Sequence, residues 1–139
     1  MIERITRRDL YLQMAKLMSQ RGTCGRLQVG SVITIENRII ATGYNGPVKD
    51  DHECNDINCF LGETCKRAIH AEANAIYFAA KNGIKLQGAT IYCTHSPCIK
   101  CAEAIIQSGI KVVEYSEEFR DTEPLKVLLR AGVDVKKYG

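Results

Sequence analysis

The alternation of helical and strand-like segments is the feature of this sequence that most narrows its fold. One amphipathic segment and two β-branched runs come first, and helical and strand-like patterns then alternate to the C-terminus. We expect helices over residues 6–22, 71–82, 99–108 and 124–131, and strands over residues 29–35, 38–44, 89–94, 111–115 and 133–137. Strands joined through helices pair in parallel, whereas strands joined by the short Glu36-Asn37 turn pair antiparallel. The sequence therefore predicts a three-layer α/β fold, in which helices flank both faces of a mixed five-stranded sheet.

Local signals define the expected ends and faces of the helices. Thr6 is a predicted N-cap, because Asp9 follows it three residues later, as in a capping box. Leu10, Met14 and Leu17 recur at i, i+4 and i+7, so we expect them at the centre of the buried stripe of the first helix. Neighbouring residues widen this stripe: Tyr11, Ala15 and Met18. The later helices are expected to end at glycines: Gly83, Gly109 and Gly132.

Length and composition favour one folded domain over residues 1–139 in a reducing compartment. The chain has 139 residues and a net charge of +3, with no basic tail and no apolar run long enough to span a bilayer. It also lacks an N-terminal signal segment, so we expect a cytoplasmic protein without membrane or nucleic-acid partners. Its seven cysteines are an odd number. In a reducing compartment, clustered cysteines bind metal or do chemistry more often than they form disulfides.

Two helix starts carry residues suited to a metal site. His70 and Glu72 open one helix, and Cys98 and Cys101 form a Cys-x-x-Cys pair after Pro97 at the start of the next. Helix N-termini favour thiolates, and two thiolates with one imidazole make three zinc ligands. Catalytic zinc takes three protein ligands and keeps a water molecule, whose pKa it lowers to about 7. Glu72 stands where a proton shuttle belongs, close to that water without being a ligand.

Each part of this pattern has a plainer interpretation when taken alone. A Cys-x-x-Cys pair is also typical of redox sites and of structural zinc sites, and a single histidine is often a capping or core residue. The combination in this order is much more specific, because it matches the H-x-E…P-C-x-x-C signature of zinc deaminases. We therefore predict a catalytic zinc held by His70, Cys98 and Cys101, with Glu72 as the acid and base.

Longer segments of the sequence resemble the deoxycytidylate deaminase family. The segments with the most specific motifs are HAEANAI at 70–76, SPCIKCA at 96–102 and GYNGP at 43–47. Others fit the same family at matching spacing: RDLY at 8–11, RGTC at 21–24, QVGSVI at 28–33 and GIKVVEY at 109–115. This resemblance covers nearly the whole chain. It implies the cytidine-deaminase fold and hydrolysis of dCMP to dUMP and ammonia, which supplies dUMP for thymidylate synthesis.

The resemblance also implies roles for residues around the metal. Asn45 would hold the sugar, and the Ala71 N–H and the region of Ser96 would hold the base. The 5′-phosphate needs cations, for which Arg26 is the first candidate. A solvated surface charge explains Arg26 equally well, and it is the more common role for each of the alternatives. The alternatives to Arg26 are Arg4, Arg7, Arg8 and Lys49. Tyr115 is expected to line the pocket, although an ordinary strand aromatic explains it almost as well. His95 is assigned either to the pocket or to the surface.

The remaining cysteines suggest a second metal. An irregular inserted loop at about 48–67 contains three of them, and some family members build a structural zinc site from such a loop and an earlier cysteine. Four thiolates would make a closed tetrahedral site: Cys24, Cys54, Cys59 and Cys65. The alternative is a set of reduced thiols, since these spacings are not those of the usual CxxC knuckle. Cys93 lies in an expected strand and should pack in the core.

The family resemblance further implies a homo-oligomer, often a hexamer, with dCTP activation and dTTP inhibition, usually with Mg²⁺. The turn at 43–47 and the cysteine loop are where an effector site is expected. Three other functions stay open. The first is a nucleic-acid base deaminase of the tRNA adenosine or polynucleotide cytidine type, which usually needs a basic surface. The second is a free-nucleoside deaminase, although small enzymes of that kind typically carry cysteine where this chain has His70. The third is a zinc-binding module without activity.

Overall fold

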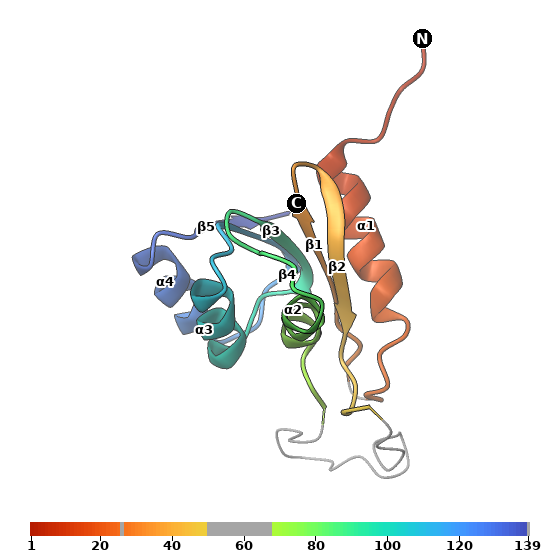
Figure 1. The fold of residues 1–139 in the computed structure, drawn as a ribbon. Helices are drawn as coiled ribbons and strands as arrows, with labels where there is room; N and C mark the ends of the chain where they lie inside the picture. Colours follow the sequence, from red (N-terminus) through yellow and green to blue (C-terminus); the bar gives the residue numbers. More distant parts are fainter. Residues whose placement is uncertain (26, 50–67, 139) are drawn as a thin grey trace.

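The elements of the structure follow one another in the order predicted from the sequence (Figure 1). The computed structural model describes residues 1–25, 27–49 and 68–138. Within these residues the helices are α1 (Arg7–Ser19), α2 (Ala71–Lys81), α3 (Ile99–Gln107) and α4 (Glu123–Arg130). The strands are β1 (Gly30–Ile35), β2 (Arg38–Tyr44), β3 (Thr90–His95), β4 (Val112–Glu117) and β5 (Asp134–Lys137). Most boundaries lie within two residues of those expected, and α1 ends three residues earlier.

The five strands form one mixed sheet in the order β2-β1-β3-β4-β5. β1 is antiparallel to both of its neighbours, β2 and β3, whereas β3, β4 and β5 run parallel. Glu36 and Asn37 join β1 to β2 with φ angles of 50° and 63°. Two successive positive φ values match the twist of a tight hairpin, so this turn brings β1 and β2 directly together. The predicted mixed sheet is confirmed.

Helices cover both faces of the sheet, which gives the three predicted layers. Of the described helices, only α1 packs on one face, where Tyr11 and Leu12 meet Val32 and Tyr92. α2, α3 and α4 lie on the other face (Figure 1), over a larger core that includes one residue from each of three strands: Ile33, Ile91 and Val113. The alternation of side chains along each strand thus sends one set to each layer. None of the helices in the described part of the chain is both long and apolar enough to cross a membrane.

The buried stripe of α1 differs from the one predicted. Leu10 and Leu17, expected at its centre, are 37% and 65% exposed, whereas Tyr11 and Ala15 are buried. The cause lies in the neighbouring strand: a Cβ atom at Gly30 would stand 2.0 Å from the carbonyl oxygen of Ala15. At this point the helix lies so close to β1 that Ala15 faces the strand, with Tyr11 and Leu12 on the same buried face. Leu10 and Leu17 are therefore displaced toward solvent.

Side-chain capping bonds are found at the starts of the first and the last helix, where the sequence favours Thr6 and either Asp121 or Thr122 as capping residues. The Oγ1 atom of Thr6 accepts a hydrogen bond of 3.1 Å from the Asp9 N–H. At α4 the N-cap residue Thr122 makes no side-chain capping bond, and Asp121 instead accepts a bond of 3.0 Å from the Glu123 N–H. The glycines expected after the later helices take positive φ angles, as predicted: Gly83, Gly109 and Gly132.

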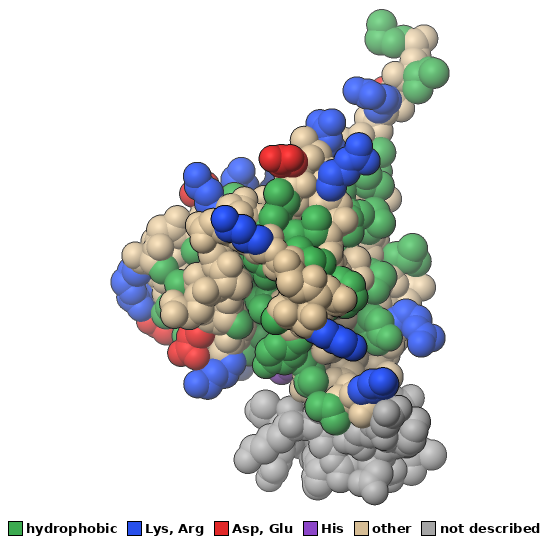
Figure 2. Space-filling view, in the orientation of Figure 1, with side chains coloured by type: hydrophobic (Ala, Val, Ile, Leu, Met, Phe, Trp, Pro, Cys, Tyr) green, Lys and Arg blue, Asp and Glu red, His purple; other side chains and the backbone are tan. Residues whose placement is uncertain are grey.

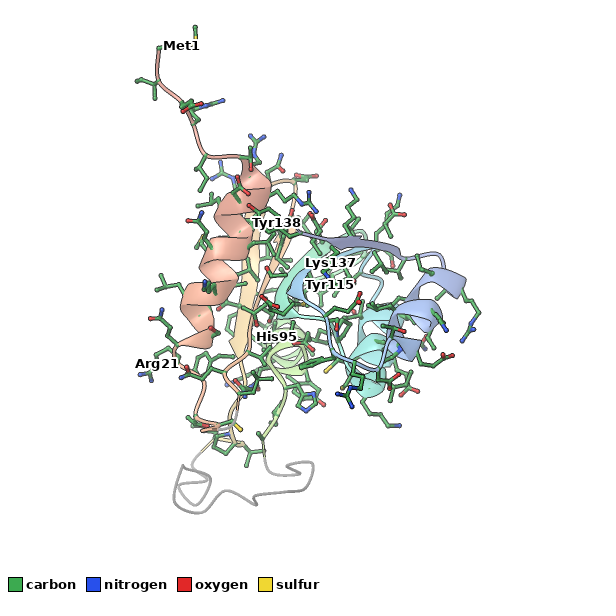
Figure 3. All side chains as sticks on the ribbon, turned by 180° about the vertical axis from the view of Figure 1, so that it is seen from behind. Met1, Arg21, His95, Tyr115, Lys137 and Tyr138 are labelled. Atoms are coloured by element: carbon green, nitrogen blue, oxygen red, sulfur yellow. The ribbon has the colours of Figure 1, made fainter. Side chains whose placement is uncertain are left out.

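The C-terminal segment is attached to the start of α1. Figure 3 shows Lys137 and Tyr138 beside this helix. Arg8 bonds to the buried Glu114 carboxylate and donates to the Lys137 carbonyl oxygen at 3.1 Å, and its guanidinium lies 5.2 Å from the Tyr138 ring centre. The Tyr138 hydroxyl also bonds to Asp9. Arg8, an alternative cation for a phosphate, is thus engaged between the helix and the sheet.

Candidate active site

Three predicted ligands meet between the starts of α2 and α3. His70 is the N-cap residue of α2, Cys98 is the N-cap residue of α3, and Cys101 lies in the first turn of α3. The Nδ1 atom of His70 lies 3.3 Å from Sγ of Cys98 and 3.5 Å from Sγ of Cys101. All three ligand atoms lie within 4.8 Å of one another. Two helix N-termini therefore place a nitrogen and two sulfur atoms around one point.

This arrangement fits a zinc ion. Tetrahedral zinc with Zn–N and Zn–S bonds of about 2.05 and 2.3 Å separates nitrogen from sulfur by about 3.6 Å. The Nδ1–Sγ distances of 3.3 and 3.5 Å are close to that separation. Among the described residues, the cluster brings together three ligands rather than the four of a closed structural site. The donor set thus suits a catalytic zinc better than a structural one.

The pKa values of the two thiols are shifted in opposite directions. The side chain of Cys101 hydrogen-bonds to Cys98 and, with His70 nearby, lowers the pKa of the Cys98 thiol to about 3. The same bond, together with burial and the Glu72 carboxylate, raises the pKa of Cys101 above its ordinary value. The pair thus loses its first proton readily and keeps its second. A metal cation would take the place of that second proton, because zinc binds cysteine as thiolate.

Glu72 is the buried acid beside this cluster. Glu72 is only 4% exposed, and its Oε1 atom has no hydrogen-bond partner among the described residues. Burial raises the pKa of Glu72 to about 7, with Cys98 adding to the rise, whereas a bond from Cys101 and the charge of His70 oppose it. A carboxyl group of this pKa can both accept and donate a proton near neutral pH. An unsatisfied buried oxygen is costly, and it is typical of a group that awaits a ligand.

Backbone contacts that the sequence pattern did not reveal hold the start of α2. Gly46 and Ile69 exchange two backbone hydrogen bonds of 3.1 and 2.6 Å, so the residue before His70 is attached to the segment after β2. Asn74 donates from Nδ2 to the Tyr44 carbonyl oxygen at 2.7 Å. Hydrogen bonds at Ile69, before His70, and at Asn74, after it, therefore fix the position of His70.

Two predicted substrate residues are buried and bonded to the main chain. Asn45 accepts a bond of 2.8 Å from the Val29 N–H and donates one of 2.7 Å to the Leu27 carbonyl oxygen. Ser96, which is 2% exposed, accepts a bond of 2.9 Å from the Phe119 N–H. Asn45 thus holds the segment before β1, and Ser96 holds the segment after β4. Their contact with a substrate stays a prediction.

Tyr115 lies in the main core at 3% exposure, where its hydroxyl donates to Glu118 at 2.6 Å. Burial, followed by this bond, raises the pKa of Tyr115 to about 12. Its place in the substrate pocket stays a prediction.

His95 stacks on Phe119 with ring centres 5.3 Å apart and borders a cavity of about 520 Å³ on the α1 side of the sheet.

The remaining cysteine predictions differ in outcome. Cys93 is fully buried in the main core, which confirms its predicted packing. Cys24 is half-buried between α1 and β1. Its proposed partners lie outside the described residues: Cys54, Cys59 and Cys65. Arg26, the first candidate for the phosphate, also lies outside them.

Comparison with known proteins gives consistent matches over the whole site. Residues 5–117 match the family described as the cytidine and deoxycytidylate deaminase zinc-binding region. ComE operon protein 2 of Bacillus subtilis is 42% identical over 98% of this chain and 73% of its own length. The deoxycytidylate deaminase of enterobacteria phage T4 is 37% identical over 89% of this chain and 86% of its own.

A solved structure matches nearly the whole chain as well. It is the dCMP deaminase of the cyanophage S-TIM5 in complex with dCMP and dUMP, which is 35% identical to this chain and superposes with a TM-score of 0.89. The match covers 99% of this chain and 100% of that one. The likeness therefore extends over both layers of helices and the sheet between them.

Proposed function

The chain belongs to the cytidine and deoxycytidylate deaminase zinc-binding family, and we propose that it hydrolyses dCMP to dUMP and ammonia. We assign this activity to one deaminase domain over residues 1–139, acting in the cytoplasm and supplying dUMP for thymidylate synthesis. The observation that carries the proposal is the buried, unpartnered Glu72 oxygen beside the converging atoms of His70, Cys98 and Cys101. A general acid and base next to a three-ligand metal position is what hydrolytic deamination requires.

The chemistry follows from the positions of these groups. His70, Cys98 and Cys101 would hold the zinc ion, which would supply an acidified water molecule as the nucleophile. Glu72 takes a proton from this water and gives it to N3 of the cytosine, which makes C4 more electrophilic. The oxygen of the water bonds to C4. Glu72 then takes the second proton from this oxygen and transfers it to the amino group, the C4–N bond breaks, and C4 becomes the carbonyl carbon of dUMP. Water is consumed and ammonia is released, so one carboxyl group serves first as base and then as acid.

The proposed substrate contacts come from the loops around the cluster. Asn45 holds the sugar, the Ala71 N–H and Ser96 hold the base, and Tyr115 lines the pocket. Arg26 is the proposed partner of the 5′-phosphate. The bonds that fix Asn45 and Ser96 to the main chain support this assignment, because recognition groups are most effective when their positions are set beforehand.

We include three further features in the proposal. The first is a homo-oligomer, with a hexamer favoured. The second is dCTP activation and dTTP inhibition with Mg²⁺, and the third is a second, structural zinc held by Cys24, Cys54, Cys59 and Cys65. Light scattering measures the first, and rates with and without each effector measure the second. For the third, metal analysis of fully loaded protein should find two zinc ions per chain, and one zinc ion per chain would contradict it.

A panel of substrates tests the activity itself. Purified protein loaded with zinc is assayed with dCMP, CMP, deoxycytidine, dCTP and a cytosine oligonucleotide, each with and without dCTP as effector. We expect the highest kcat/KM with dCMP. Preference for the oligonucleotide would favour a nucleic-acid base deaminase instead. On the face shown in Figure 2, Lys and Arg side chains lie scattered rather than in one continuous stripe, which does not favour that alternative.

A further inference from the structure

A serine on the central part of the sheet contacts the helix turn that carries Glu72. Ser31 of β1 is fully buried, and it pairs with Gly43 on one side and Cys93 on the other. Its Oγ atom donates a hydrogen bond of 2.9 Å to the carbonyl oxygen of Ala71. Ala71 is the first residue of α2 and stands between His70 and Glu72. The bond therefore connects the sheet to the peptide that leads into the proposed acid and base.

The geometry of the peptide group gives this contact its importance. The carbonyl group of Ala71 and the N–H of Glu72 belong to one planar unit, so a bond to the first fixes the orientation of the second. The Oε1 atom of Glu72 has no hydrogen-bond partner among the described residues. No hydrogen bond to this oxygen therefore orients the carboxylate. Its direction depends more on side-chain packing and on the orientation of the backbone that carries it.

The neighbours of Ser31 keep this connection short. A Cβ atom at Gly43 would lie 2.2 Å from the Ala71 oxygen and 3.1 Å from Oγ of Ser31, so only glycine leaves room for the helix turn and the hydroxyl together. On the other side, the Cys93 thiol is fully buried and close enough to Glu72 for the two to interact electrostatically. The first turn of α2 thus packs closely on three neighbouring strand residues: Gly43, Ser31 and Cys93.

We propose that Ser31 is a positioning residue for the deamination, which orients the Ala71–Glu72 peptide and so aims the Glu72 carboxylate at the reacting base. This inference rests on the proposed function. A merely structural serine would instead satisfy a buried carbonyl lone pair, and its loss would lower stability without changing the chemical step. The two roles make different predictions for kcat.

Two variants of Ser31 and one matched control separate these roles. Ser31→Ala removes the hydroxyl, and Ser31→Cys keeps the approximate volume with a weaker donor. Ser108→Ala is the control, because Ser108 donates a bond of the same length, 2.9 Å, to a helix carbonyl, that of Ile105 at the far end of α3. The measurements are kcat and KM for dCMP, zinc content, and hydrogen exchange of the amides at the start of α2.

We expect Ser31→Ala to lower kcat at least about tenfold, the effect expected from a modest misalignment of a reacting group, with KM within about twofold and zinc content unchanged. Ser31→Cys should lie between wild type and Ser31→Ala. The amides at the start of α2 should exchange faster in Ser31→Ala, and Ser108→Ala should show neither change. Equal kcat in Ser31→Ala and Ser108→Ala, or loss of zinc in Ser31→Ala, would overturn the proposal.

The exchange measurement keeps this inference distinct from the proposed function. Wild-type protein inactive on dCMP would end the proposed function and the catalytic role of Ser31 with it. If wild type is active but Ser31→Ala keeps both its kcat and its slow exchange, the inference alone fails. Should Ser31→Ala not fold, the comparison of Ser31→Cys with Ser108→Ala decides the question in the same way.

Discussion

Substitution of Gly43 by alanine tests how closely α2, which begins directly after His70, must approach the sheet. The added Cβ atom would lie 2.2 Å from the Ala71 oxygen and 2.8 Å from the Ala75 nitrogen. Carbon and oxygen atoms in close contact are normally about 3.3 Å apart or more, so the first turn of α2 must retreat by about 1 Å. Both contacting atoms belong to the backbone, which cannot rotate away as the end of a side chain can.

The retreat would move His70 and Glu72 together, because they flank Ala71. A misplacement of about 1 Å in a reacting group costs about 100-fold in rate. Overpacking of this kind also lowers the free energy of unfolding by about 1–3 kcal/mol. We therefore expect Gly43→Ala to fold, to lose about 1–3 kcal/mol in urea unfolding, and to deaminate dCMP about 100-fold more slowly than wild type.

Gly46→Ala is the matched control for folding. The nearest atom to a Cβ at Gly46 is Oγ1 of Thr23 at 3.4 Å, an ordinary contact. Its free energy of unfolding should change by no more than about 0.5 kcal/mol. Steady-state rates and urea unfolding of both variants are compared with wild type. If Gly43→Ala keeps the wild-type rate and stability, the close approach of α2 does not constrain the site, and the reasoning is refuted.

Three further predictions concern the metal, the sheet and pH. Cys101→Ala removes one of three ligands, so zinc affinity measured by competition with a chelator should fall at least about 100-fold, and unchanged affinity would exclude Cys101 as a ligand. Arg8→Met leaves Glu114 buried without its cation and should cost about 1.5–3 kcal/mol in urea unfolding, most of which the added substitution Glu114→Gln should restore. The pKa of Tyr115 is raised to about 12 in the folded protein and is about 10 in the unfolded chain, so its stabilising contribution is present below pH 10 and is lost as pH rises toward 12. The difference in free energy of unfolding between wild type and Tyr115→Phe should therefore shrink from pH 9 to pH 11, and a constant difference would contradict the shift.

The convergence of His70, Cys98 and Cys101 and the order of the elements were predictable because both depend on short-range patterns. The spacing of His70 to Glu72 and of Cys98 to Cys101 places each pair in the first turn of a helix, and parallel strands bring such helix starts to one edge of a sheet. The Glu36-Asn37 turn was predictable for the same reason, because two adjacent residues are enough to join β1 and β2 as a hairpin. The sequence therefore sufficed for the order of the elements, the mixed sheet and the three residues that converge.

The failures all involve contacts between segments distant in the chain. The stripe of α1 was predicted to centre on Leu10 and Leu17, but with Gly30 close to Ala15 the helix presents Tyr11, Leu12 and Ala15 to the sheet instead. Ser31 read as an ordinary residue in a β-branched run. Its bond to Ala71 joins residues 40 positions apart, which no periodicity reveals. Such close approaches depend on the packing of whole layers, so they emerge only in three dimensions.

The central claim is that Glu72 transfers the protons in a site whose zinc is held by other residues. Glu72→Gln tests it most directly, through the rate of dCMP deamination and the zinc content of the same sample. We predict that this variant keeps the wild-type zinc content and loses activity by at least about 10²–10⁴-fold, the range for removal of a general acid and base. Loss of zinc together with activity would make Glu72 a ligand or a structural residue, and activity equal to that of wild type would contradict the mechanism.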